Sequence, residues 1–126
     1  MKNKKTCLEY IRLLQKGNND DLIKLFIADA IVDSPIYGVM PAQEFYKKLK
    51  EDTKSSNLTI HGQFEDKTSG NIALYFNYKW ILQSQKEVNF DVVDIIEFDT
   101  SHKIKKLKII YDTFESRKLI DELKAG

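Results

Sequence analysis

The sequence is most tightly constrained by a long stretch of period-two hydrophobicity in residues 72–98. Apolar residues occupy every second position before a short turn at residues 84–86, and the alternation resumes after it. Successive side chains of a β-strand point to opposite faces, so this pattern predicts two long strands joined by that turn. Strands of this length bury one face on a small chain only if their sheet curves strongly. The predicted inner face of the first strand consists of Ile72, Leu74, Phe76, Tyr78, Trp80 and Leu82.

The residues before this stretch have helical spacing instead. In residues 6–16 apolar side chains recur at intervals of three and four, which predicts a helix with one buried face that ends at Gly17. Residues 18–20 offer N-caps for a second, short helix. Pro41 suits the first position of a third helix, which we expect to run to about residue 53.

Shorter patterns complete the secondary structure. Residues 30–33 indicate a short strand, and residues 36–40 indicate a loop. Residues 58–65 alternate and predict a strand that precedes the long pair, and residues 105–113 predict the last long strand. Residues 114–124 are typical of a terminal helix.

Helices followed by antiparallel strands predict an α+β fold, with the helices packed on one face of the sheet. A chain of 126 residues is ordinary for one domain, so we expect a single domain over residues 1–126. Its 42% hydrophobic and 31% charged residues are typical of a packed core with a solvated surface. A strongly curved sheet wrapped around helices forms a cone, and the mouth of a cone is a natural site for a small ligand.

Charge and cysteine content exclude several functions. The 20 basic and 19 acidic residues leave a net charge of +1, which argues against nucleic acid as the main partner. No run approaches the ~18 apolar residues of a membrane span, so we expect no membrane partner. One cysteine and two histidines provide neither a disulfide framework nor a ligand set for a metal. Together with the absence of a signal-peptide pattern, this predicts a cytoplasmic protein without a metal or a cofactor.

One carboxylic acid interrupts the apolar face of the strand after the turn. A carboxylate buried among apolar side chains is costly and usually stays protonated, so Asp94 could donate a strong hydrogen bond inside a pocket. Alternatively, Asp94 is an ordinary core residue that bonds to a backbone group or a tyrosine hydroxyl. The other members of its face are Val88, Phe90, Val92, Ile96 and Phe98.

Four further polar residues are open to two interpretations. Tyr10 lies on the apolar stripe of the first helix, where it is either a core aromatic or a hydrogen-bond donor to a ligand. Asp33 and Ser34 either cap the loop that follows them or line the mouth of the pocket. Asp112, at the end of the last strand, is either a helix cap or an inward-facing acid.

These residues, in this order, resemble the nuclear transport factor 2-like superfamily, and within it the ketosteroid isomerase-like and SnoaL-like branches. The motifs "DDLIKLF" and "ADAIVDSP" after Tyr10 and Gly17 are similar to the isomerase pattern. The motif "VVDIIEF" resembles the isomerase segment with the buried acid, and "KIKKLKIIYD" resembles the SnoaL-like ending. The resemblance covers roughly residues 8–120. It implies a cystatin-like α+β roll, with a strongly curved, cone-shaped antiparallel sheet around the N-terminal helices.

The resemblance also implies roles for individual residues. Tyr10 matches the tyrosine that donates to the steroid enolate, and Asp94 matches the neutral acid beside it. The position of the general base is occupied by Ser34, whose hydroxyl is too weak a base on its own, so we expect poor ketosteroid isomerase activity. Val92 stands where epoxide hydrolase relatives have an arginine. Asp112 resembles the acid that SnoaL-like cyclases use, and it is the best remaining base if it faces inward.

These observations predict a SnoaL-like protein that binds an apolar small molecule with a carbonyl or hydroxyl group. Tyr10 and Asp94 would hold the oxygen, and a cofactor-free isomerase or cyclase reaction would use Asp112 as its base. The alternative is a ligand-binding or dimerisation module without turnover. Two acids with divergent pKa values in one cavity would favour the enzyme, and a cavity filled by its own aromatics would favour the module. The predicted ligand-binding residues are Ser34, Phe76, Trp80, Phe90 and Val92.

The outward face of the long strands predicts a homodimer. Tyr75, Ile81, Val93 and Ile95 lie among polar neighbours on this face, a mixture that suits an interface better than open solvent. Proteins of the family that this chain resembles commonly pair through the same sheet.

Overall fold

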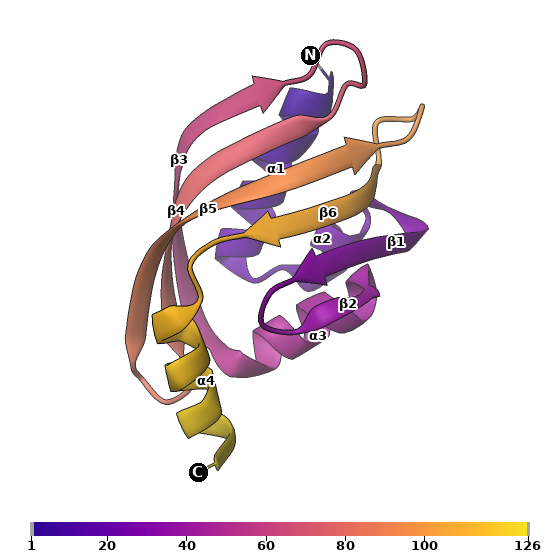
Figure 1. Cartoon of the computed structure of the whole chain (residues 1–126). Helices are drawn as coiled ribbons and strands as arrows, with labels where there is room; N and C mark the ends of the chain where they lie inside the picture. Colours follow the sequence, from indigo (N-terminus) through magenta and orange to yellow (C-terminus); the bar gives the residue numbers. More distant parts are fainter. Residues whose placement is uncertain (1, 126) are drawn as a thin grey trace.

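The computed structural model describes residues 2–125, in which three helices pack on one side of a curved sheet and a fourth helix follows its last strand (Figure 1). The elements are α1 (Lys2–Lys16), α2 (Asn19–Ile23), β1 (Phe26–Ser34), β2 (Gly38–Pro41), α3 (Ala42–Asp52), β3 (Thr53–Glu65), β4 (Ile72–Leu82), β5 (Glu87–Phe98), β6 (Ile104–Ile110) and α4 (Phe114–Ala125).

The sheet has six strands in the order β2-β1-β6-β5-β4-β3. Neighbouring strands are antiparallel except β1 and β6, which run parallel with Val32 opposite Leu107. The sheet is therefore mixed, because the β1–β6 pair is parallel where the sequence predicts antiparallel strands. The β1–β2 hairpin joins the sheet beside β6, a strand far away in the sequence, and a hydrophobic pattern does not specify the relative direction of such strands.

The first hairpin is also more extensive than the sequence pattern indicates. β1 begins at Phe26, and not at residue 30 as the sequence predicts. Phe26 pairs with Ile104, and an irregularity in the pairing with β6 follows before Ile31. Residues 38–40, predicted to be a loop, and Pro41, predicted to begin the third helix, form the short edge strand β2. Pro41 ends this strand and is the N-cap of α3, which is compatible with its missing N–H because β2 is an edge.

The long strands behave as predicted on their inner face. All six apolar residues of the β4 face are buried, and Val88, Val92 and Ile96 of β5 are buried beside them. β3 departs from a regular alternation because a bulge lies between Ile60 and Gly62. Phe64, which the sequence places on the same face as Leu58, pairs beyond the bulge with an outer-face residue and is 62% exposed.

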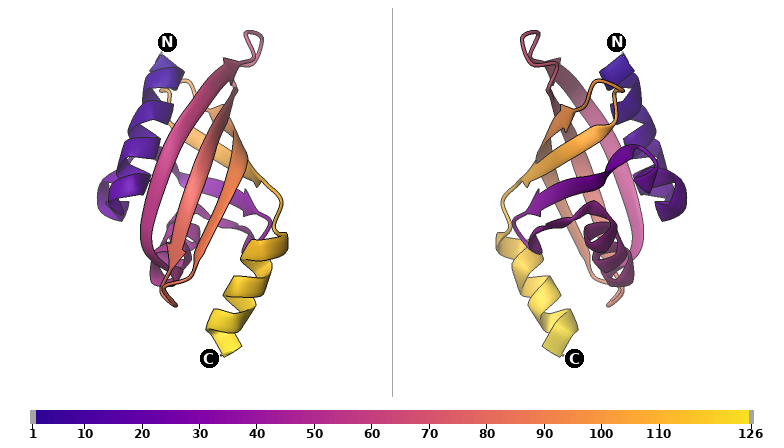
Figure 2. Two further views of the ribbon diagram at one scale, coloured as in Figure 1. Left: turned by 90° about the vertical axis from the view of Figure 1, so that its left-hand side faces the viewer. Right: turned by 90° about the vertical axis from the view of Figure 1, so that its right-hand side faces the viewer.

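A buried carboxylate connects three segments at the end of the sheet where α3 and α4 lie (Figure 2). Asp52, at the C-terminus of α3, is 3% exposed. Its Oδ2 accepts a hydrogen bond of 2.6 Å from the Tyr37 hydroxyl, and its Oδ1 pairs with the ammonium group of Lys124. The bonds hold the β1–β2 turn and α4 against the end of α3.

We expect Asp52→Ala to lower the free energy of unfolding by about 2–3 kcal/mol, because it removes a charged acceptor with two donors. Asp121→Ala, which removes an exposed carboxylate of α4, is the matched control and should change stability by less than about 0.5 kcal/mol. Urea unfolding of both variants measures the difference. Equal stability of the two variants would show that Asp52 does not hold α4 in place.

Candidate functional site

An internal cavity lies between the helices and the inner face of the sheet. Its volume is about 40 Å³, which is room for a water molecule or two but far below the ~300 Å³ of a typical ligand pocket. The cavity is lined mainly by apolar and aromatic side chains, which come from α1, α3, four strands, the β1–β2 turn and the segment after β6. They are Tyr10, Leu14, Ser34, Tyr37, Phe45, Leu49, Phe76, Tyr78, Trp80, Phe90, Val92, Asp94, Ile109 and Tyr111.

All of the site residues predicted from the sequence line this cavity except Asp112. Asp112 is exposed, and its Oδ1 accepts a hydrogen bond of 3.0 Å from the backbone N–H of Phe114 at the start of α4. The cap interpretation is thus confirmed, and the condition that Asp112 faces inward is not met. A chain that turns outward after β6 to begin α4 carries Asp112 away from the cavity.

Asp94 is the most unusual residue of the cavity. It is 1% exposed on β5, between the cross-strand neighbours Leu74 and Ile109. Within residues 2–125 its Oδ1 has no hydrogen-bond partner, so the bond that the alternative interpretation expects is not made by this oxygen. Burial raises the pKa of Asp94 well above its usual value, because its charged form would lose hydration. Burial therefore favours the protonated form of Asp94, which has a proton to donate into the cavity.

A pair of tyrosines lies on the helical side of the cavity. The hydroxyl groups of Tyr10 on α1 and Tyr46 on α3 are 2.7 Å apart, and both rings are buried. Burial raises the pKa of each hydroxyl well above 10, so both stay protonated. The shared hydrogen bond uses one of the two hydroxyl protons, which leaves the other free for a ligand. The sequence analysis did not identify Tyr46 as a candidate, because nothing in the spacing of apolar residues along the third helix links it to Tyr10.

Ser34 combines both roles that the sequence left open. Its Oγ accepts hydrogen bonds of 3.2 Å from the backbone N–H groups of Ile36 and Tyr37, and the residue also lines the cavity. A hydroxyl that accepts two N–H groups still has a proton to donate, but it is a poorer base. Asp33 is not part of the cavity lining, because adjacent strand residues face opposite ways.

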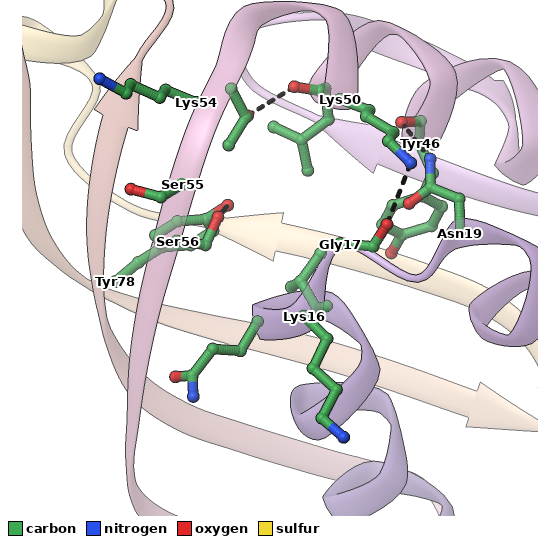
Figure 3. A pocket seen from close by; sticks show the side chains of 13 residues that line it. Lys16, Gly17, Asn19, Tyr46, Lys50, Lys54, Ser55, Ser56 and Tyr78 are labelled. Carbon is green, nitrogen blue, oxygen red and sulfur yellow. Dashed lines mark hydrogen bonds between the residues drawn. The ribbon is translucent and has the colours of Figure 1, made fainter. Parts of the chain in front are cut away.

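A second, larger pocket of about 350 Å³ lies outside the cavity, between the C-terminus of α1, α3 and the start of β3 (Figure 3). Leu14, Leu49 and Tyr78 line both spaces. The sequence analysis did not detect this pocket, because its walls come from five elements with no common motif. The remaining lining residues are Gln15, Lys16, Gly17, Asn19, Tyr46, Lys50, Thr53, Lys54, Ser55 and Ser56.

In the described part of the chain, no group of three or more His, Cys, Asp or Glu side chains is placed to hold a metal ion. None of the helices in residues 2–125 is long and apolar enough to cross a membrane.

Comparison with known proteins identifies the fold. No family model and no curated protein matches the sequence. Solved structures do match: a nuclear transport factor 2-like protein of unknown function from Burkholderia pseudomallei K96243 has a TM-score of 0.82 at 13% identity, over 95% of this chain and 98% of that one. TerC, co-crystallised with polyporic acid, has a TM-score of 0.80 at 13% identity, over 96% and 99% of the two chains.

The epoxide hydrolase/cyclase-like enzyme SalBIII also matches, with a TM-score of 0.77 at 14% identity, over 88% of this chain and 91% of that chain. Identities this low show the fold and nothing finer. The protein therefore has the nuclear transport factor 2-like fold, a curved and unclosed mixed sheet packed against helices. This confirms the fold that the sequence resemblance implies.

The raised pKa of Asp94 predicts a dependence of stability on pH. A buried acid whose pKa is higher in the folded state binds its proton more tightly there, so its contribution to the free energy of unfolding falls as pH rises above about 4. The loss approaches at most about 1.4 kcal/mol per pH unit until the folded-state pKa is reached. Asp94→Asn should remove this loss.

Urea unfolding between pH 4 and pH 8 measures this loss of stability as the difference in the free energy of unfolding between the wild type and Asp94→Asn. Asp91→Asn, an exposed change on the same strand, is the control and should keep the slope of the wild type. Parallel curves for the wild type and Asp94→Asn would mean that water reaches Asp94 in solution.

Proposed function

We propose that this protein binds a small apolar molecule with a carbonyl or hydroxyl oxygen, which Asp94 and Tyr10 hold inside the cavity. The observation that carries the proposal is Asp94 Oδ1, a fully buried polar atom without a protein partner in an apolar, aromatic lining. Leaving such a group unsatisfied costs about 1–3 kcal/mol, which a ligand that accepts or donates a hydrogen bond would recover. The free proton of the tyrosine pair offers a second donor to the same oxygen.

The cavity favours binding over acid-base chemistry. A proton-transfer enzyme needs a base within hydrogen-bond reach of the substrate in addition to the donor. Among the described residues that line the cavity, Asp94 is the only carboxylic acid, and the proposal uses it as the hydrogen-bond donor. Aromatic rings fill much of the space, with Phe90 stacked on Tyr111 at a centroid distance of 4.3 Å. The second candidate is an isomerase or cyclase, in which Asp94 and Tyr10 would stabilise a developing oxyanion. Ser34 lines the cavity where the resemblance places a base, but its hydroxyl is too weak a base on its own.

Two structural neighbours support a small-molecule role in general terms. TerC was crystallised with polyporic acid, and SalBIII has a role in pyran ring formation in the polyether salinomycin. Both share only the fold with this chain, so they support a ligand inside the cone and do not identify it. A ligand larger than the present 40 Å³ requires the side chains around the cavity to move apart.

The oxygen requirement is testable with two ligands of nearly equal shape. We expect 2-naphthol to bind the wild type more tightly than naphthalene, and Asp94→Leu to lose about tenfold of the affinity for 2-naphthol, the value of one hydrogen bond of about 1.4 kcal/mol. Naphthalene should bind the variant at least as well as the wild type. Titration calorimetry measures all four affinities.

Asp91→Leu is the matched control, because it makes the same change on the solvent-exposed part of the same strand. Thermal unfolding checks that Asp94→Leu is folded, which we expect since the change removes a buried unsatisfied group. Equal binding of the two ligands by the wild type, or no binding of either, would contradict the proposed function.

We also propose that two copies of the chain pair through the outer face of the sheet. Tyr75, Val93 and Ile110 are cross-strand neighbours on β4, β5 and β6, so they form a continuous apolar row on this face. Ile110 is half exposed, and Ile95 lies beside the row. Apolar rows with polar borders are typical of association surfaces.

Val93→Lys should convert a dimer into a monomer, because it places a charge in the middle of the row. Asn89→Lys, a charge at the far end of the same strand, is the control and should leave the dimer intact. Sedimentation at micromolar concentration distinguishes the 14.7 kDa chain from twice that mass. A wild type that sediments as a single chain would refute the pairing.

A further inference from the structure

The outer pocket has a composition different from that of the inner cavity. Its lining includes three lysines, Lys16, Lys50 and Lys54, and no Asp or Glu. Within residues 2–125 none of these lysines forms an ion pair, whereas Lys24, Lys79, Lys86 and Lys124 each pair with a carboxylate. Three like charges around a concave, partly apolar space create a positive potential that attracts an anion.

We propose that the outer pocket binds the anionic head group of the ligand, and that the same molecule extends through the pocket wall to Asp94. The ligand is then an apolar carboxylic acid with a carbonyl or hydroxyl oxygen at its other end. This inference rests on the proposed function, since it extends the ligand that the inner cavity holds.

The two spaces are close enough for one molecule to occupy both. Leu14, Leu49 and Tyr78 are exposed to the outer pocket on one side and to the inner cavity on the other. A single layer of side chains therefore separates them. Tyr78 spans this layer: its hydroxyl lies 2.8 Å from the Ser56 hydroxyl at the outer pocket, and its ring stacks on Phe90 of the inner cavity at a centroid distance of 5.5 Å.

The volumes are consistent with a shared ligand. The outer pocket, at about 350 Å³, lies within the range of known small-molecule sites, whereas the inner cavity, at about 40 Å³, takes only a few atoms. An elongated molecule would place most of its body in the outer pocket and its oxygen-bearing end in the inner cavity. In the proposed complex, the side chains of Leu14, Leu49 and Tyr78 move apart to open the wall between the two spaces.

Helix capping explains part of the lysine cluster but not all of it. Lys50 Nζ donates a hydrogen bond of 3.1 Å to the carbonyl oxygen of Gly17, just beyond the C-terminus of α1 (Figure 3), and a cation in this position is favourable without any ligand. Lys54 lies on β3 and is bonded only to the side-chain oxygen of Gln85, a neutral group. Capping therefore explains Lys50, whereas Lys54 bonds to a neutral side chain of the β4–β5 turn and has no carboxylate that neutralises its charge.

Three probes with the same ring system separate the two halves of the proposal. 6-Hydroxy-2-naphthoate has both the hydroxyl and the carboxylate, 2-naphthol has the hydroxyl alone, and 2-naphthoate has the carboxylate alone. We expect 6-hydroxy-2-naphthoate to bind the wild type at least tenfold more tightly than 2-naphthol at low salt. The gain should shrink as salt rises, because exposed charges are screened.

Variants of the outer pocket then test whether its lysines cause the gain in affinity that the carboxylate provides. The triple change Lys16→Gln, Lys50→Gln and Lys54→Gln should reduce the affinity for 6-hydroxy-2-naphthoate to that for 2-naphthol, and should leave 2-naphthol binding unchanged. Lys48→Gln, an exposed lysine of α3 outside the pocket, is the matched control and should have no effect. Asp94→Leu should weaken the binding of 6-hydroxy-2-naphthoate and leave the binding of 2-naphthoate unchanged, because only the former has a hydroxyl group that reaches the inner cavity.

The outcomes distinguish this inference from the proposed function. If 2-naphthol binds and the carboxylate adds no affinity, or if the triple variant keeps the gain, the outer pocket is not the anion site and the inner-cavity proposal stands. If Asp94→Leu leaves 6-hydroxy-2-naphthoate unaffected, the ligand lies in the outer pocket alone and the spanning arrangement is wrong. If none of the three probes binds, both proposals fail.

Discussion

The structure depends on covering the inner face of β4 and β5, an apolar surface longer than a small flat sheet could bury. The sheet curves so that α1 and α3 cover this face, and the curved arrangement leaves a small space in which the two layers do not fully interdigitate. Among the described residues that line this space, Asp94 is the only carboxylic acid, and its Oδ1 is buried without a hydrogen-bond partner. A folded protein that needed only stability would gain from an apolar residue there. The position of Asp94 is thus the clearest sign that the space has a use beyond packing.

Strong periodicity made most of the fold predictable. The alternation in β4 and β5 correctly assigned the inner face, including Asp94, because a strand with one buried face has only one register that is compatible with its apolar residues. The errors occur where the pattern is short or interrupted. The edge strand β2 has four residues and no buried face, and the bulge after Ile60 moves Phe64 to the outer side without any mark in the sequence.

The candidate site was predictable for side chains on regular elements and not for side chains at their ends. Tyr10, Phe76 and Asp94 lie within long elements, so their spacing already placed them on the buried face. Asp112 follows β6, where the backbone direction depends on how α4 begins, and it turned out to be a cap. Tyr46 was missed as a functional group because its partner Tyr10 is 36 residues away, and only the packing of α3 against α1 brings the hydroxyls together.

The tyrosine pair connects the inner cavity with the outer pocket. Of these two spaces, Tyr10 lines the inner cavity and Tyr46 lines the outer pocket. Their shared hydrogen bond can run in either direction: when Tyr46 donates to Tyr10, the free proton belongs to Tyr10 and faces the inner cavity, and when Tyr10 donates, the free proton belongs to Tyr46. A ligand oxygen beside Asp94 favours the first arrangement, and an anion in the outer pocket favours the second. A ligand with an oxygen at each end therefore makes the two ends compete for one proton, so the affinity for the whole molecule should be lower than the sum of its parts predicts.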